Sequence, residues 1–443
     1  MRIQLSDHFT YRRLLRFVMP PVLMMVCTSL YGIVDGFFVS NYVGKTSFAA
    51  VNLIMPVLMG VGSVGFMVGT GGSAVVSVKL GEGKRDTANR YFSMLIYTTL
   101  AFSVLLAVFG FVFTPAISAA LGAEGELLHD CIIYGRILFA SGPVFILQNI
   151  FQNFFVTAER PDLSLKVSVA AGVTNMAFDY LLIAVFRQGI AGAALATALG
   201  EAVGGIVPVF YFARKNNSLL RLGKALPEWR TIALACANGS SEMVSNLSMS
   251  VVNILYNFQL MRMAGEDGVA AYGIIMYVNF VFQAIFLGYA IGCAPVVSYH
   301  YGAGNRVELK NLSGKSLVLM CVTGIVMTLL AEFCNAPLVR VFAGYDAALS
   351  AMTCQGFRLY ALAFLMMGVN IWSSAFFTAL NNGVVSSAIS FLRTLLFQTA
   401  AILLLPLLFG MKGIWLAIVA AELPGLLVSV IFLAWGRKRY RYA

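Results

Sequence analysis

The sequence predicts an all-α membrane protein with twelve transmembrane helices, arranged as two parallel six-helix repeats around a central cleft. Three observations lead to this fold class. The composition is too apolar for a soluble domain, and twelve apolar runs are each long enough to cross a bilayer. The chain also matches itself when it is shifted by 221 residues, which is half its length.

The composition alone excludes several classes of protein. Of the 443 residues, 60% are hydrophobic and only 11% are charged, and the mean hydropathy is +0.84. A soluble domain this apolar could not cover its own surface with polar groups. A cytosolic enzyme, a nucleic-acid-binding module and a disordered scaffold are therefore excluded. The expected surroundings are a lipid bilayer, and no nucleic-acid partner is expected.

The predicted spans are apolar runs of roughly 20 residues or more, the length that a helix needs to cross the hydrocarbon core. The first run is too long for a cleavable signal peptide and lacks an Ala-x-Ala site, so we expect it to be a span. The twelve spans lie at 14–42, 50–78, 91–114, 132–158, 164–186, 190–213, 231–262, 270–298, 314–335, 355–380, 384–409 and 413–436.

The basic residues predict the orientation of these spans. With the N-terminus in the cytoplasm, 22 of the 30 Lys and Arg residues fall on the cytoplasmic side and 5 on the opposite side. The positive-inside rule then places both termini in the cytoplasm. The net charge of +11 is explained as a topology signal. The same division puts the three histidines (His8, His129 and His300) in termini or loops.

The internal repeat is clearest between positions 44 and 85, where 13 of 42 residues are identical at the offset of 221. Gly81-Glu82-Gly83-Lys84-Arg85, for example, falls on Gly302-Ala303-Gly304-Asn305-Arg306. Each half holds six spans, an even number, so both halves enter the membrane in the same direction. We expect an N-terminal lobe at 1–213, a cytoplasmic linker at 214–230 and a C-terminal lobe at 231–443. Rocking of the lobes would give alternating access to a cleft between them.

Polar groups within the spans are candidates for function, because an ionisable group at membrane depth costs about 2.5–3.5 kcal/mol. Helical rise places Asp35, Asp179 and Thr197 at about 10–12 Å below the outer ends of their spans. Asn175 lies one turn before Asp179, on the same face of its helix. Two carboxylates, an amide oxygen and a hydroxyl at one depth predict a site for Na⁺ or H⁺. The alternative is that these groups only link helices by hydrogen bonds.

Three more carboxylates lie deep in spans. Glu201 and Glu422 occupy equivalent positions of the repeat, and we expect a role in gating or in recognition of substrate charge. Glu242 could bind a cationic substrate in the cleft. The alternative for each is a carboxylate satisfied by a neighbouring helix or by water. Pro20 and Pro21 predict a hinge in the first span, because a proline inside a helix loses a hydrogen bond.

Motifs for an enzyme or an ATP-driven pump are absent from the sequence. Gly314-Lys315-Ser316 lacks the glycine that a P-loop needs five residues earlier, and neither H-E-x-x-H nor G-x-S-x-G occurs. We therefore expect no enzymatic activity and no cofactor other than a coupling ion.

As a set, these residues resemble the multidrug and toxic compound extrusion (MATE) family over essentially the whole chain. The resemblance rests on the twelve spans, the two lobes, the Gly-x-Gly loops after spans 2 and 8, and six residues: Pro20, Tyr31, Asp35, Asn175, Asp179 and Thr197. It implies a cation-coupled antiporter, with Asp35, Asn175, Asp179 and Thr197 coupling transport to H⁺ or Na⁺. It also places Tyr31 among the residues for substrate or gating.

The sequence is most similar to the bacterial MepA-like branch, in which a carboxylate matching Glu422 is common. It lacks the span-10 carboxylate of several members, so ion coupling is expected in the N-terminal lobe. The predicted protein thus resides in a bacterial plasma (inner) membrane and exports small organic, cationic or amphipathic compounds, functioning as a monomer. The alternative is a flippase for a lipid-linked or polysaccharide precursor. The duplication argues against a channel or receptor.

Overall fold

The computed structural model describes residues 3–344, 346–440 and 442, and the regular secondary structure of these residues is helical throughout. The helices are α1 (Tyr11–Phe38), η1 (Val39–Val43), α2 (Lys45–Gly81), α3 (Arg85–Ala120), α4 (Gly125–Thr157), α5 (Pro161–Phe178), η2 (Asp179–Val185), α6 (Gly189–Ala213), α7 (Trp229–Gly302), α8 (Arg306–Ala343), α9 (Ala347–Ala361), α10 (Phe364–Ala379), α11 (Gly383–Phe391), η3 (Leu392–Phe397) and α12 (Gln398–Tyr440), where η denotes a π-helical segment.

Within these described residues, nine helical segments are long and apolar enough to cross a membrane, and two of them contain a break at a glycine. Gly265 has φ 63° inside α7, and Gly410 has φ 55° inside α12. The rings of Tyr256 and Tyr272, on the two sides of Gly265, stack with centroids 4.6 Å apart. A straight helix would hold them about 24 Å apart, so α7 is two antiparallel helices.

The bent pair α9 and α10, with an angle of 49° between its halves, forms one further broken span. When the helices on each side of Gly265 and Gly410 are counted separately, each of the twelve predicted spans has a helical counterpart in the described residues. The predicted number of spans and the all-α class are confirmed. The sequence did not show that the turns at Gly265 and Gly410 are so short.

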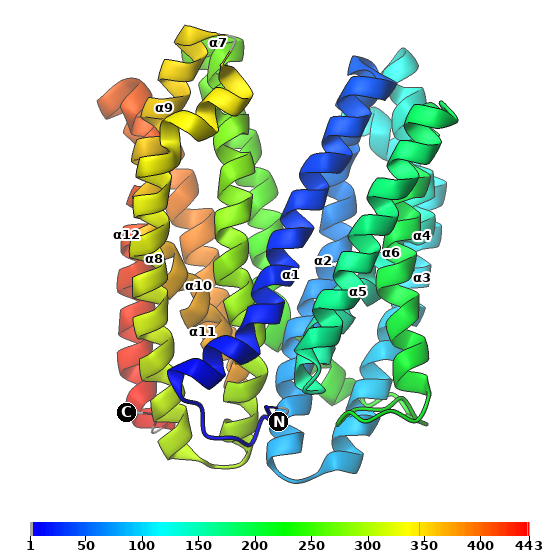
Figure 1. Cartoon of the computed structure of the whole chain (residues 1–443), viewed down its shortest axis with the longest axis vertical. Helices are drawn as coiled ribbons and strands as arrows, with labels where there is room; N and C mark the ends of the chain where they lie inside the picture. The colour runs from blue at the N-terminus through cyan, green and yellow to red at the C-terminus, as the bar shows by residue number, and fades with distance from the viewer. Residues whose placement is uncertain (1–2, 345, 441, 443) are drawn as a thin grey trace.

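Figure 1 shows α1–α6 gathered on one side of the molecule and α7–α12 on the other. Both termini lie at one end, which we call the terminal end, and the two bundles diverge toward the opposite end. The first half of the chain meets the second mainly where α1 and α2 pack against α7. At the offset of 221 residues, α1 corresponds to the first half of α7 and α2 to its second half. The two bundles therefore meet through equivalent elements of the repeat.

Glycines let α2 and α7 approach closely near the terminal end. A Cβ on Gly81 would lie 2.0 Å from the Tyr299 carbonyl oxygen, and one on Gly302 would lie 2.1 Å from the Val78 carbonyl oxygen. These two contacts are related by the offset of 221 residues, so a pseudo-two-fold axis passes between them. A larger residue at either glycine would force the helices apart.

The segment before α1, which we call the N-terminal strap (residues 3–10), joins the two bundles at the terminal end. Leu5 and Phe9 are fully buried. The Leu5 N–H donates to Oε1 of Glu159, between α4 and α5, at 2.7 Å. The Phe9 N–H donates to Oε1 of Glu308 in α8 at 2.9 Å, and Nδ1 of His8 lies 2.6 Å from Oε2 of the same carboxylate.

The prediction that His129 and His300 lie in loops is wrong. His129 lies near the start of α4, because that helix begins several residues before the apolar run. His300 is only 2% exposed in the last turn of α7, where the Phe9 ring packs edge-on at 6.4 Å. The strap covers His300, and an apolar run alone does not show such a contact.

The segment predicted as a linker is irregular between α6 and α7 and lies along α3. The Arg221 N–H donates to Oδ1 of Asn89 at 2.8 Å, and the Gly223 N–H donates to Oγ of Ser93 at 2.9 Å. Nη2 of Arg85 donates to the Ser218 carbonyl at 2.9 Å. The lobe boundaries themselves stay a prediction.

The outer surface of the bundles carries long apolar side chains. Leu105 in α3 is 68% exposed, and Leu407 and Leu408 in α12 are 80% and 74% exposed. Exposed apolar patches of this extent are unfavourable in water and are expected for helices that face lipid.

Candidate ion-coupling site

The residues predicted to bind the coupling ion come from three helical segments of the first bundle. Asp35 lies in the last turn of α1, and Thr197 lies in α6. Asn175 lies in the last turn of α5, and Asp179 begins η2. The structure brings the four together, since Asn175, Asp179 and Thr197 all contact the Asp35 carboxyl group.

Both carboxylates of this cluster lie next to a π-helical turn. The backbone N–H of Val39, the first residue of η1, is directed at the Asp35 carbonyl, and Asp179 is the first residue of η2. π turns interrupt the regular hydrogen-bond ladder and occur often at functional sites. Here they set the direction of the helix ends that carry the carboxylates.

Four oxygens of the cluster are buried and have no hydrogen-bond partner among the described residues. They are Oδ1 of Asp35, Oδ1 of Asn175, and both Oδ1 and Oδ2 of Asp179. Asp179 is fully buried, and Asn175 is 4% exposed. An unpaired buried acceptor costs about 1–3 kcal/mol, and more if it is charged. A bound proton or cation would relieve this cost, and oxygen ligands suit Na⁺.

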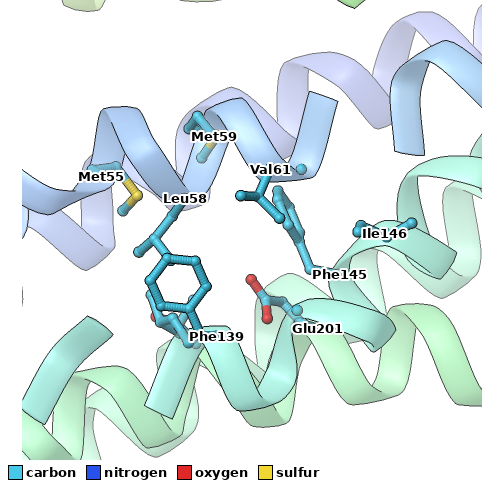
Figure 2. Close-up of a pocket in the computed structure, with 12 residues that line it drawn as sticks. Met55, Leu58, Met59, Val61, Phe139, Phe145, Ile146 and Glu201 are labelled. Atoms are coloured by element: carbon cyan, nitrogen blue, oxygen red, sulfur yellow. The ribbon is translucent and has the colours of Figure 1, made fainter. Parts of the chain in front are cut away.

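Glu201 lies one turn beyond Thr197 in α6, and both residues line a pocket of about 60 Å³. Figure 2 shows the Glu201 carboxyl group pointing among apolar side chains of α2 and α4, with Phe145 and Val61 nearby. Ser141 in α4 donates a hydrogen bond to Oε2 of Glu201 at 2.8 Å. The pocket is large enough to hold water beside the Glu201 carboxyl group.

Tyr31 in α1 lies near both Asp35 of the cluster and Glu201 of the pocket. Its side chain contacts Thr28 and Gln148 and lies near Glu201 and Asp35. Gly172 of α5 provides the space, because a Cβ there would lie 2.8 Å from Cδ1 of Tyr31. Pro20 and Pro21 both lie inside α1, which continues through them as a single helix from Tyr11 to Phe38. The hinge at Pro20 stays a prediction.

The second bundle places Glu422 in a different environment from its repeat equivalent, Glu201. Glu422 in α12 is 4% exposed, and its Oε2 accepts a hydrogen bond from Nδ2 of Asn370 at 2.6 Å. Its Oε1 lies 3.5 Å from Nη1 of Arg393, in η3. Glu422 is therefore neutralised by a protein cation. Glu242 in α7 also lies within electrostatic range of Arg393.

The chain matches the model of the MatE family at residues 20–181 and 243–402, which include most of the spans of both bundles. The chain belongs to this family. Among curated MatE relatives, it is 23% identical over 406 residues to the multidrug export protein MepA of Staphylococcus saprophyticus, covering 91% of this chain and 88% of that protein. It is 24% identical to MepA of Staphylococcus haemolyticus, covering 81% of this chain and 80% of that protein.

Solved MATE structures share the fold. A crystal structure of MATE in complex with MaL6 has a TM-score of 0.90 and 21% identity, with coverage of 97% of this chain and 96% of that one. A structure described as the outward-facing conformation of a multidrug resistance MATE family transporter has a TM-score of 0.89 and 21% identity, covering 97% and 95%. The twelve-helix MATE fold is confirmed, and the protein is a multi-pass membrane transporter rather than an enzyme.

Sequence reasoning missed several residues of these sites. Arg393 is given no role by the sequence analysis, although a buried arginine at membrane depth is itself a functional signal. Ser141 and Gln148 are neutral residues in an apolar helix, and no sequence pattern distinguishes them from packing residues. Tyr134 is fully buried beside Thr197 and Asp35. Only the helix arrangement brings it there.

Proposed function

We propose that the protein is an antiporter that exports organic, cationic or amphipathic compounds in exchange for inward H⁺ or Na⁺. Its MepA relatives are named multidrug export proteins, which supports the export of organic compounds. The observation that carries the coupling proposal is the cluster of buried acceptor oxygens at Asp35, Asn175 and Asp179. These oxygens are satisfied only when a proton or cation is bound, so their occupancy affects the stability of the conformation that holds them.

The contacts between the two bundles support alternating access as the transport mechanism. They touch through α1, α2 and α7 near the terminal end and diverge at the opposite end (Figure 1). With both termini in the cytoplasm of a bacterial cell, this conformation faces outward. Release of the terminal-end contacts would open the other side. The pathway lies within one chain, so a monomer suffices for transport. The ion site lies within the first bundle, so this bundle can change shape on ion binding while the second bundle stays unchanged.

The test is efflux of ethidium from proteoliposomes under a pH gradient or a Na⁺ gradient applied separately. We expect one gradient to drive efflux, and we expect Asp35→Asn to abolish the dependence on that gradient. Asp86→Asn is the matched control, because Asp86 is exposed in the first turn of α3, far in the sequence from the cluster.

Unchanged gradient-driven efflux in Asp35→Asn would contradict the site assignment and direct attention to Glu201 and Glu422. Absence of ethidium efflux under both gradients would contradict the substrate class. A flippase for a lipid-linked precursor would then be the next function to test.

A further inference from the structure

The N-terminal strap makes hydrogen bonds to both bundles at the terminal end. Oε1 of Glu159 accepts the Leu5 N–H at 2.7 Å, and Oε1 of Glu308 accepts the Phe9 N–H at 2.9 Å. Glu159 lies in the turn between α4 and α5, and Glu308 lies in the first turn of α8. Glu159 is 8% exposed and Glu308 is 4% exposed. Two buried carboxylates of different bundles therefore hold the same short segment.

The Phe9 end of the strap is anchored to α8 by several side chains. Nδ2 of Asn311 and Nζ of Lys315 donate to the Phe9 carbonyl at 2.9 Å and 2.6 Å. Oε2 of Glu308 also lies 2.6 Å from Nδ1 of His8. One helix thus binds both the N–H and the carbonyl of Phe9, and separating this end from α8 would leave all of these groups to find new partners.

The Leu5 end reaches the first bundle at the turn between α4 and α5. Glu159 has φ 57° in this turn, and its carboxylate accepts the Leu5 N–H. The Leu5 side chain is fully buried, so detachment of this end would expose it to water. Leu5 and Phe9 are four residues apart, and a chain of that length extends to about 14 Å at most. The strap cannot stay on both carboxylates once its two attachment points lie farther apart than this length.

We propose that the N-terminal strap is a latch that holds the terminal end closed, and that it detaches from Glu159 but stays bound to Glu308 when the bundles separate there. The proposal rests on the alternating access proposed above and adds a control on one of its steps. Separation of α2 from α7 moves the α4–α5 turn away from α8, because the turn belongs to the first bundle. The Glu159 end is released, since three side chains of α8 hold the other end.

Pulsed electron paramagnetic resonance tests the latch. Spin labels at positions 84 and 307, which are exposed on different bundles, report opening of the terminal end in a background without native cysteines. We expect Glu159→Ala to raise the ratio of open to closed molecules by about tenfold, because the bond from the Leu5 N–H to a carboxylate is lost. Leu5→Asp should shift the ratio in the same direction without altering the α4–α5 turn. Glu126→Ala is the control, because Glu126 is an exposed carboxylate at the opposite end of α4.

A label on the strap itself tests which end detaches. Position 6 is exposed in the strap, and position 166 is exposed in α5 of the first bundle. In the open molecules the distance between labels at 6 and 166 should lengthen, whereas the distance between labels at 6 and 307 should keep its wild-type value. The reverse pattern, with 6 and 307 moving apart, would overturn the proposal.

An unchanged ratio of open to closed molecules in both Glu159→Ala and Leu5→Asp would also overturn it. Gly81→Ala separates this outcome from a failure of alternating access, because it acts on the contact between α2 and α7 and not on the hydrogen bonds of the strap. If Gly81→Ala opens the terminal end and the strap variants do not, the bundles separate but the strap is no latch. If none of the variants opens it, alternating access fails as well. The measurement needs no substrate and no gradient, so it is independent of the efflux assay.

Discussion

Replacement of Gly239 by alanine should shift the protein away from the conformation that is closed at the terminal end. Gly239 lies in α7 directly against α2, near Gly71. A Cβ on Gly239 would lie 1.8 Å from the Met67 carbonyl oxygen and 3.0 Å from the Gly71 backbone nitrogen. Both neighbours are backbone atoms, so no side chain can rotate to make room.

The magnitude follows from this geometry. An ordinary carbon–oxygen contact needs about 3.4 Å, so the two helices have to separate locally by about 1.5 Å. Overpacking of this kind costs about 1–3 kcal/mol. The cost falls only on the conformation in which α2 and α7 touch. A cost of about 2 kcal/mol changes the ratio of the two conformations by roughly 30-fold.

Pulsed electron paramagnetic resonance would measure this shift. Spin labels at positions 84 and 307, both exposed at the terminal end on different bundles, report the distance between the bundles in a background without native cysteines. Gly239→Ala should increase the population with a long distance. Gly273→Ala, in the other half of α7 beyond Gly265, is the control, because a Cβ there meets nothing within 4 Å. Identical distance distributions for the two variants would refute the reasoning.

Three other perturbations have expected outcomes. Glu308→Ala removes the acceptor for His8 and for the Phe9 N–H, so the N-terminal strap should exchange its amide hydrogens faster in mass spectrometry. Gly265→Ala forces a side chain into a backbone conformation that favours glycine and should cost about 1–3 kcal/mol, seen as a lower Tm in detergent. Glu422→Ala leaves Arg393 buried without its ion pair and should cost about 3–5 kcal/mol in the same assay.

Each of these has a matched control. Glu266→Ala changes an exposed carboxylate and should leave exchange in the strap unchanged. Gly273→Ala should lower Tm less than Gly265→Ala. Glu332→Ala breaks only an exposed ion pair of 3.8 Å, which contributes about 0–1 kcal/mol. Equal losses of Tm in Glu332→Ala and Glu422→Ala would contradict the expectation that the buried ion pair contributes more to stability than the exposed one.

Much of the fold could be predicted because the bilayer imposes a strong local rule. A helix that crosses it needs about 20 apolar residues, and each predicted span has a helical counterpart. The reversals at Gly265 and Gly410 were not predicted, since a single glycine in an apolar stretch does not distinguish a helix interior from a tight turn. The strap was also missed, because residues 3–10 carry no periodic pattern and are held by Glu159 and Glu308 from distant helices.

The sequence by itself determined the membrane class and the duplication. It also singled out the four polar residues of the first bundle, because a carboxylate in an apolar span is rare, and Asn175 and Thr197 each lie one helical turn before such a carboxylate. Only the tertiary structure decided which charges meet. Glu201 and Glu422 are equivalent in the repeat, yet Glu201 receives a hydrogen bond from Ser141 beside a pocket and Glu422 lies against Arg393. The physical reason is that electrostatic interactions depend on distances between helices, and spacing along one helix does not contain those distances.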